Sequence, residues 1–127
     1  MNEMILSAWI MAVALQEGNG RVDHAAYNRH ENARGAWQVR PIMIKEVKRL
    51  TGKTWSHRRM HEPVYAKAFV RSYFKARLER GALLWDITRS WNGSGIAATK
   101  YANEVELRYW KKVGDQLAAT GKGRVRG

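Results

Sequence analysis

Glycine and proline divide this chain into segments that have the periodicity of α-helices. The only two prolines, Pro41 and Pro63, each stand where a helix can begin, since the first helical turn does not need their missing N–H. Glycines interrupt the pattern at 18–20, 35, 52, 81, 93–95 and 121–127. We therefore predict a mainly α fold of five or more helices, over 3–17, 41–51, 63–80, 83–92 and 99–119.

The segment 63–80 is expected to be the central helix, because its apolar residues cover two adjoining faces. The segment 21–40 lacks helical periodicity, so we expect irregular structure or a short hairpin there. Residues 1–120 are long enough to bury the core of one domain. The last residues, 121–127 (GKGRVRG), are expected to be a flexible basic tail.

The absence of cysteine excludes disulfide frameworks, zinc fingers and thiol nucleophiles. We expect no cofactor and no bound metal. The formal charge is +12, and all 23 basic residues lie between Arg21 and Arg126. Such a charge favours polyanionic partners, which include nucleic acid, anionic lipid and anionic wall polymers.

The apolar segment from Ile5 to Leu15 is expected to be a buried core helix. It is preceded by Glu3 and by no basic residue, which is unlike a secretory signal. It is also shorter than the roughly 20 residues that span a bilayer. We therefore expect no membrane span and no signal peptide.

Glu17 is the residue that most needs an explanation. At about 100° per residue it falls within about 20° of Leu6, on the apolar stripe that Ile10 and Val13 continue. Either its side chain points to water from a frayed last turn, or it is a general acid. Apolar surroundings and the negative end of the helix would both help such a carboxyl to keep its proton near neutral pH.

Three further motifs follow Glu17, which itself lies in ALQEG (14–18). They are GAWQ (35–38), SWNGSG (90–95) and YANEV (101–105). In their order and separations the four motifs resemble those of the soluble lytic transglycosylases and goose-type lysozymes. That family has a catalytic Glu at the end of its first helix, then Gly-x-x-Gln, then an aromatic-Asn-x-Gly motif, and a Tyr in the following helix. The resemblance covers roughly residues 10–115 and implies an α+β, lysozyme-like fold.

The resemblance implies an enzyme that cleaves the β-1,4 bond between N-acetylmuramic acid and N-acetylglucosamine in peptidoglycan. Glu17 would be the catalytic acid, Asn92 would bind substrate near it, and the hydroxyl of Tyr101 would orient it. In the transglycosylase reaction the product is a 1,6-anhydro sugar and one carboxyl suffices. Gly18 departs from the pattern, because the family usually has Ser there. From position alone, Asn92 could simply end a helix and Tyr101 could simply pack in the core.

The residues around Gly35 have their own chemical interpretation. Gly35 would allow a special turn or a close approach of the backbone to a sugar. The amide of Gln38 can both donate and accept, which suits an N-acetyl or hydroxyl group, although a polar residue before a helix is often only solvent-exposed. Trp37 and Trp91 flank motif residues, so each is either a core residue or a platform on which a sugar stacks.

A hydrolytic lysozyme of the same fold is the alternative outcome. It requires a second carboxylate roughly 5–10 Å from the first. Glu31 is the candidate, since it lies between Asn28 and Gln38; Asp23 and Asp86 are the other acids near the motifs. The sequence does not separate a water held by Glu31 from attack by the sugar's own hydroxyl.

Two alternatives come from other classes of protein. A nucleic-acid-binding module would use the basic cluster of Lys45, Lys48, Arg49, Lys53, Arg58 and Arg59. An inactive structural relative, such as a virion component, would explain Gly18. Under the main interpretation the partners are peptidoglycan strands and an anionic wall surface, and no nucleic acid. We expect a monomer, made in the cytoplasm and acting in the periplasm or cell wall, as phage or secretion-apparatus enzymes do.

Overall fold

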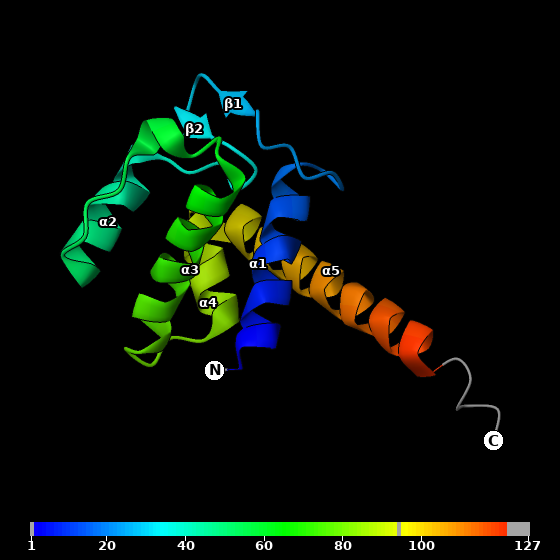
Figure 1. The fold of residues 1–127 in the computed structure, drawn as a ribbon. Helices are drawn as coiled ribbons and strands as arrows, with labels where there is room; N and C mark the ends of the chain where they lie inside the picture. Colours follow the sequence, from blue (N-terminus) through cyan, green and yellow to red (C-terminus); the bar gives the residue numbers. More distant parts are fainter. Residues whose placement is uncertain (1, 94, 122–127) are drawn as a thin grey trace.

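A computed structural model describes residues 2–93 and 95–121 of the chain, and this part is mainly helical, as predicted (Figure 1). The helices are α1 (Glu3–Glu17), α2 (Pro41–Thr51), the short 3-10 helix η1 (His57–Arg59), α3 (Pro63–Leu78), α4 (Leu84–Asn92) and α5 (Gly95–Gly121). Two short strands, β1 (Tyr27–Asn28) and β2 (Ala33–Arg34), form an antiparallel hairpin inside the segment predicted to be irregular or hairpin.

The observed bounds of α1 and α2 match the predicted ones. The observed bounds of α3 and α4 differ from the predicted ones by one or two residues. The largest difference is at α5, which begins at Gly95 rather than at residue 99. Residues 95–98 are small or apolar, so helix can continue back to the glycine. The same helix ends at Gly121, the first residue of the predicted tail; residues 122–127 lie outside the described part of the chain.

The starts of three helices follow from local chemistry. The side-chain oxygen of Asn2 accepts hydrogen bonds from the backbone N–H groups of Met4 and Ile5, which α1 itself leaves unpaired. Pro41 and Pro63 are the first residues of α2 and α3, as their fixed backbone angle favours.

The core is formed by buried residues of all five α-helices and of the loops that contain Trp37 and Trp55. Helix α3 contacts α1, α2 and α4, while α5 packs against α1 and α4. Leu6, Ile10 and Val13 are buried, so the apolar stripe of α1 is a core face as predicted. The indole N–H of Trp9 donates to the hydroxyl of Thr88 over 2.7 Å, which joins α1 to α4 inside this core.

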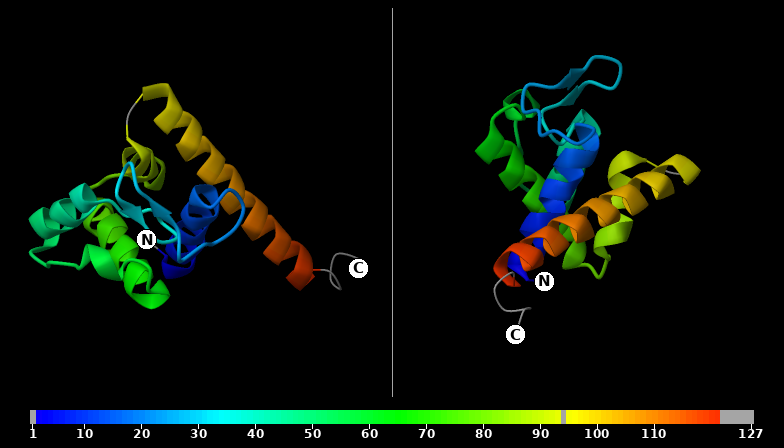
Figure 2. Two further views of the ribbon diagram at one scale, coloured as in Figure 1. Left: turned by 90° about the horizontal axis from the view of Figure 1, so that it is seen from above. Right: turned by 90° about the vertical axis from the view of Figure 1, so that its right-hand side faces the viewer.

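Helix α5 crosses α1 and then extends beyond the rest of the molecule, as Figure 1 and the left view of Figure 2 show. The crossing sets residues of α5 beside the C-terminal end of α1. Across residues 2–93 and 95–121, none of the helices has the length and apolar character that a membrane span requires.

Candidate functional site

Glu17 is the last residue of α1 and packs against α5. Its carboxylate accepts a hydrogen bond from the hydroxyl of Tyr101, a residue 84 positions later in the chain. Burial raises the pKa of Glu17 from 4.5 to about 7; the hydrogen bond from Tyr101 acts in the opposite direction. The side chain is therefore held in a partly buried position, and a frayed last turn that points to water is excluded.

Tyr101 is suited to hold this carboxyl in place. Its side chain is only 8% exposed and lies on the face of α5 that meets α1. Burial, followed by the nearby charge of Glu17 and the hydrogen bond to it, raises the pKa of Tyr101 well above its usual range. The phenol therefore keeps its proton at neutral pH and remains a hydrogen-bond donor.

Two charged residues from other elements also act on Glu17. The negative charge of Glu31, in the loop between β1 and β2, raises the pKa of Glu17, and the positive charge of Arg40 lowers it. The Asn28 amide donates to Glu31 over 3.2 Å, and a guanidinium nitrogen of Arg40 donates to the carbonyl of Trp91 over 2.7 Å. Arg40 is absent from the sequence-based set of site residues, although it lies two positions after the Gly-x-x-Gln motif.

The structure explains why glycine follows Glu17. A Cβ atom at Gly18 would lie 1.7 Å from the carbonyl oxygen of Arg21, so any side chain would force the turn apart. The amide of Arg21 in turn donates to the carbonyl of Gly18 over 3.2 Å. Glycine at position 18 is therefore required by the tight turn that leaves α1.

Gly35 and Gln38 shape the loop after the hairpin. Gly35 has a φ of +79°, and a Cβ there would lie 2.0 Å from the carbonyl oxygen of Met60. The special turn predicted for Gly35 is therefore present. The close approach that Gly35 allows is between its own backbone and the backbone of Met60. The Gln38 amide donates to the carbonyl of Gly35 over 3.0 Å, which leaves its second hydrogen and its oxygen for other partners.

Trp37 and Trp91 are core residues, and the prediction that either is a sugar-stacking platform is wrong. Each indole is only 1% exposed. Trp37 donates its N–H to the carbonyl of Ile10 over 2.8 Å, and Trp91 donates to the carbonyl of Trp37 over 3.0 Å. The two rings thus connect α1, the loop before α2, and α4.

Asn92 ends α4 and is exposed to solvent. The next residue, Gly93, lines a hollow of about 300 Å³ together with Arg40 and Ser90. Of the groups that act on Glu17, Arg40 lines this hollow, while Glu17 and Tyr101 do not. Of the other acids considered, Asp23 accepts from the backbone N–H of Ala25, which gives it a role in a turn.

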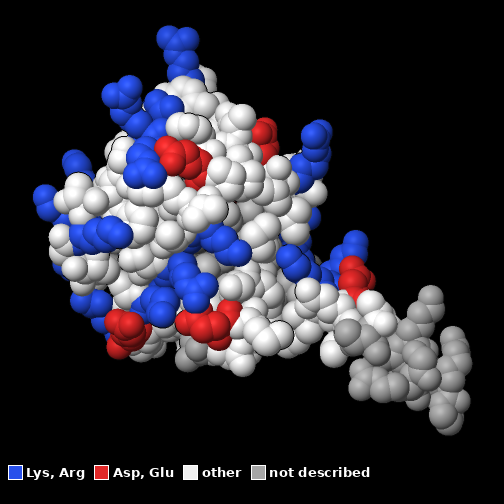
Figure 3. All heavy atoms as spheres, viewed as in Figure 1, with Lys and Arg blue, Asp and Glu red and all other residues white. Residues whose placement is uncertain are grey.

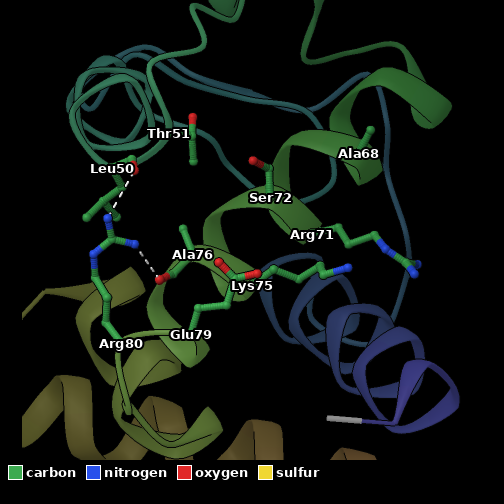
Figure 4. Close-up of a pocket in the computed structure, with 9 residues that line it drawn as sticks. All are labelled: Leu50, Thr51, Ala68, Arg71, Ser72, Lys75, Ala76, Glu79 and Arg80. Carbon is green, nitrogen blue, oxygen red and sulfur yellow. Dashed lines mark hydrogen bonds between the residues drawn. The ribbon is translucent and has the colours of Figure 1, made fainter.

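A second hollow, of about 490 Å³, lies between α2 and α3 (Figure 4). Arg80 donates there to the carbonyls of Ala76 and Leu50, which ties the two helices together. Arg71 and Lys75 pair instead with Glu3 of α1. These cations have structural partners, and none of the predicted site residues lines this hollow.

Basic side chains are spread over the face shown in Figure 3, with few acidic ones among them. The predicted cluster on α2 and the residues after it is exposed. Two of its members have acidic partners, since Arg49 pairs with Glu46 and Arg59 with Glu62. Lys53 lies over the ring of Trp55, with its nitrogen 3.9 Å from the ring centre.

The candidate site therefore combines the end of α1, the hairpin loop, the residue before α2, and α5. Within residues 2–93 and 95–121, no three His, Asp or Glu side chains lie close enough together to bind one metal ion. Comparisons of the chain with protein-family models, with curated proteins and with solved structures found no match.

The raised pKa of Glu17 predicts how Glu17→Gln changes stability with pH. Because the folded pKa lies above the unfolded value of 4.5, wild type loses stability as pH rises from 4.5 through about 7. The variant lacks this loss. Its free energy of unfolding relative to wild type should therefore rise by up to about 3 kcal/mol between about pH 4 and about pH 8. Urea denaturation at both pH values measures it, and a pH-independent difference would contradict a buried, protonatable Glu17.

Gly18→Ser should destabilise the protein by about 1–3 kcal/mol, because the new Cβ displaces the backbone at Arg21. The matched control is Gly114→Ala. Gly114 lies within α5, and nothing stands within 4 Å of its Cβ position, so stability should stay the same or rise by up to about 1 kcal/mol. Thermal unfolding of both variants tests this. Wild-type stability in Gly18→Ser would show that the turn adapts freely.

Proposed function

We propose that this chain is a lytic transglycosylase of the lysozyme-like type, which cleaves peptidoglycan between N-acetylmuramic acid and N-acetylglucosamine. The observation that carries the proposal is Glu17, a carboxyl with a pKa of about 7 that Tyr101 holds at the end of α1. A group with this pKa can give and accept a proton at neutral pH, which is what a single acid–base catalyst needs. The four motifs that resemble the transglycosylase family are the second support.

The reaction needs one carboxyl in two roles. Protonated Glu17 gives its proton to the glycosidic oxygen as the bond from that oxygen to the anomeric carbon breaks. The carboxylate then removes the proton of the C6 hydroxyl of N-acetylmuramic acid, and O6 forms a new bond to the same anomeric carbon. The proton is thus back on Glu17, no water is consumed, and the product is a 1,6-anhydro sugar.

The neighbours of Glu17 suit this double role. Tyr101 donates to the carboxyl, and it has no need to change protonation state during the cycle. Arg40 favours the carboxylate and Glu31 favours the protonated acid, so the two charges oppose each other. Neither form is then so stable that the next proton transfer becomes difficult.

The net positive charge fits the same substrate. Peptidoglycan and its attached polymers carry carboxylates and phosphates, and a charge of +12 would hold the protein near such a surface in a salt-sensitive way. The anionic wall is therefore the proposed partner of the basic face.

Glu17→Gln tests the function directly. The variant should lyse purified peptidoglycan about 10²–10⁴-fold more slowly than wild type, because the amide cannot transfer a proton. Glu79→Gln, an exposed acid that follows α3, is the control and should lyse at the wild-type rate. Equal lysis by Glu17→Gln and wild type would refute the assignment. No lysis by either, with salt-dependent DNA binding, would favour the nucleic-acid alternative.

A hydrolytic lysozyme is the second candidate, and the position of Glu31 favours it. Glu31 is near enough to raise the pKa of Glu17, and Asn28 holds its carboxylate. From there it could activate a water molecule on the opposite side of the sugar.

The mass of the products separates the two reactions. Transglycosylation should give muropeptides that are lighter than hydrolysis products by the mass of one water, and Glu31→Gln should retain most of the lytic rate. Mass spectrometry of the released fragments measures the mass difference. The loss of turbidity of a wall suspension measures the lytic rate of Glu31→Gln. Full-mass reducing ends, together with loss of lysis in Glu31→Gln, would assign the protein as a hydrolase.

A further inference from the structure

Three polar residues of α5 share the face that meets the end of α1. Tyr101, Glu104 and Arg108 are spaced by three and four residues, so they lie one above another on the same side of the helix. Tyr101 contacts Glu17. The other two contact Gln16, the residue immediately before Glu17.

The amide of Gln16 is bound at both ends. Its nitrogen donates to the carboxylate of Glu104, and its oxygen accepts from the guanidinium of Arg108 over 2.7 Å. An amide has both a donor and an acceptor end, so only this orientation satisfies a carboxylate and a guanidinium together. Lys100 adds a fourth group, with its nitrogen 3.9 Å from the other oxygen of Glu104.

We propose that the polar chain Arg108–Gln16–Glu104 positions Glu17 against Tyr101, so that Gln16 is a positioning residue of the site. The catalytic meaning of this role rests on the proposed function. The geometric role concerns only how the last turn of α1 is fixed to α5.

The tie adds to a backbone cap at the end of α1. The carbonyls of Ala14, Leu15 and Gln16 accept from the backbone N–H groups of Gly18, Gly20 and Asn19. These bonds close the last turn, but they do not fix it to α5. Glu17 is the last residue of this turn, and Gly18 follows at once. The two hydrogen bonds of Gln16 reach residues 88 and 92 positions later, so they bind the last turn to a different helix. With the turn fixed, the Glu17 carboxyl stays within reach of the Tyr101 hydroxyl.

The groups that shift the pKa of Glu17 come from three elements: Tyr101 on α5, Glu31 in the hairpin loop, and Arg40 before α2. Glu104 and Arg108, also on α5, contact the neighbouring Gln16. Burial raises the pKa of Glu17 and the hydrogen bond from Tyr101 lowers it. The rise in this pKa that Tyr101→Phe causes therefore measures how closely Tyr101 is held to the carboxyl.

Gln16→Met tests the proposal, since Met keeps the length of the side chain but removes both hydrogen bonds. The pKa of Glu17 is measured from the carboxyl carbon signal of ¹³C-glutamate-labelled protein, with Glu17→Gln identifying the signal. In Tyr101→Phe it should shift upward, because the burial remains while the hydrogen bond is lost. In the Gln16→Met background, Tyr101→Phe should raise this pKa by less than it does in wild type, because Tyr101 and Glu17 are no longer held together.

The control is Asn103→Ala. It removes a hydrogen bond of 2.9 Å between Trp85 and Asn103, which also joins α5 to another helix but does not involve Glu17. It should leave the pKa of Glu17 unchanged even where it lowers stability. If Gln16→Met does not fold, Arg108→Met takes its place, since it frees one end of the same amide, and a smaller effect of Tyr101→Phe on the pKa of Glu17 is again expected.

If Tyr101→Phe raises the pKa of Glu17 as much in folded Gln16→Met as in wild type, the proposal is overturned, because Gln16 then acts independently of Tyr101. The titration needs no substrate, so it separates this proposal from the proposed function. Coupled pKa shifts in a protein that does not lyse peptidoglycan would refute the function and retain the positioning role.

Discussion

The contact between α5 and the end of α1 is the interaction on which the candidate site depends. It buries the carboxyl of Glu17 and gives it one defined partner, the hydroxyl of Tyr101. Without α5, the carboxyl of Glu17 would lose its hydrogen-bond donor and the surface that buries it. The burial that raises its pKa and the hydrogen bond that fixes its direction thus have the same origin, the packing of two helices that are distant in sequence.

The core supports this contact through aromatic residues that link separate elements. Trp37 bonds to the backbone of α1, Trp91 bonds to the backbone at Trp37, and Arg40 bonds to the carbonyl of Trp91. The loop before α2 is therefore held between α1 and α4, which places the charge of Arg40 near Glu17. These buried groups position Arg40, while Glu31 acts on Glu17 from the hairpin loop.

Glycine has two distinct structural uses beside this site. At Gly18 the turn passes so close to the carbonyl of Arg21 that a side chain has no room, although its backbone angles are open to other residues. At Gly35 a positive φ and the close approach of Met60 both require glycine. The presence of glycine at position 18 is thus explained by packing.

The sequence alone determined the helices, the hairpin segment and the unusual position of Glu17, because helix periodicity and turn preferences act between residues close together in the chain. The tertiary structure decided which side chains share the site. It made Trp37 and Trp91 core residues, and it brought Arg40, Gln16 and Arg108 into the surroundings of Glu17. These contacts join residues up to 92 positions apart, and local periodicity carries no information about which distant side chain will meet a given one.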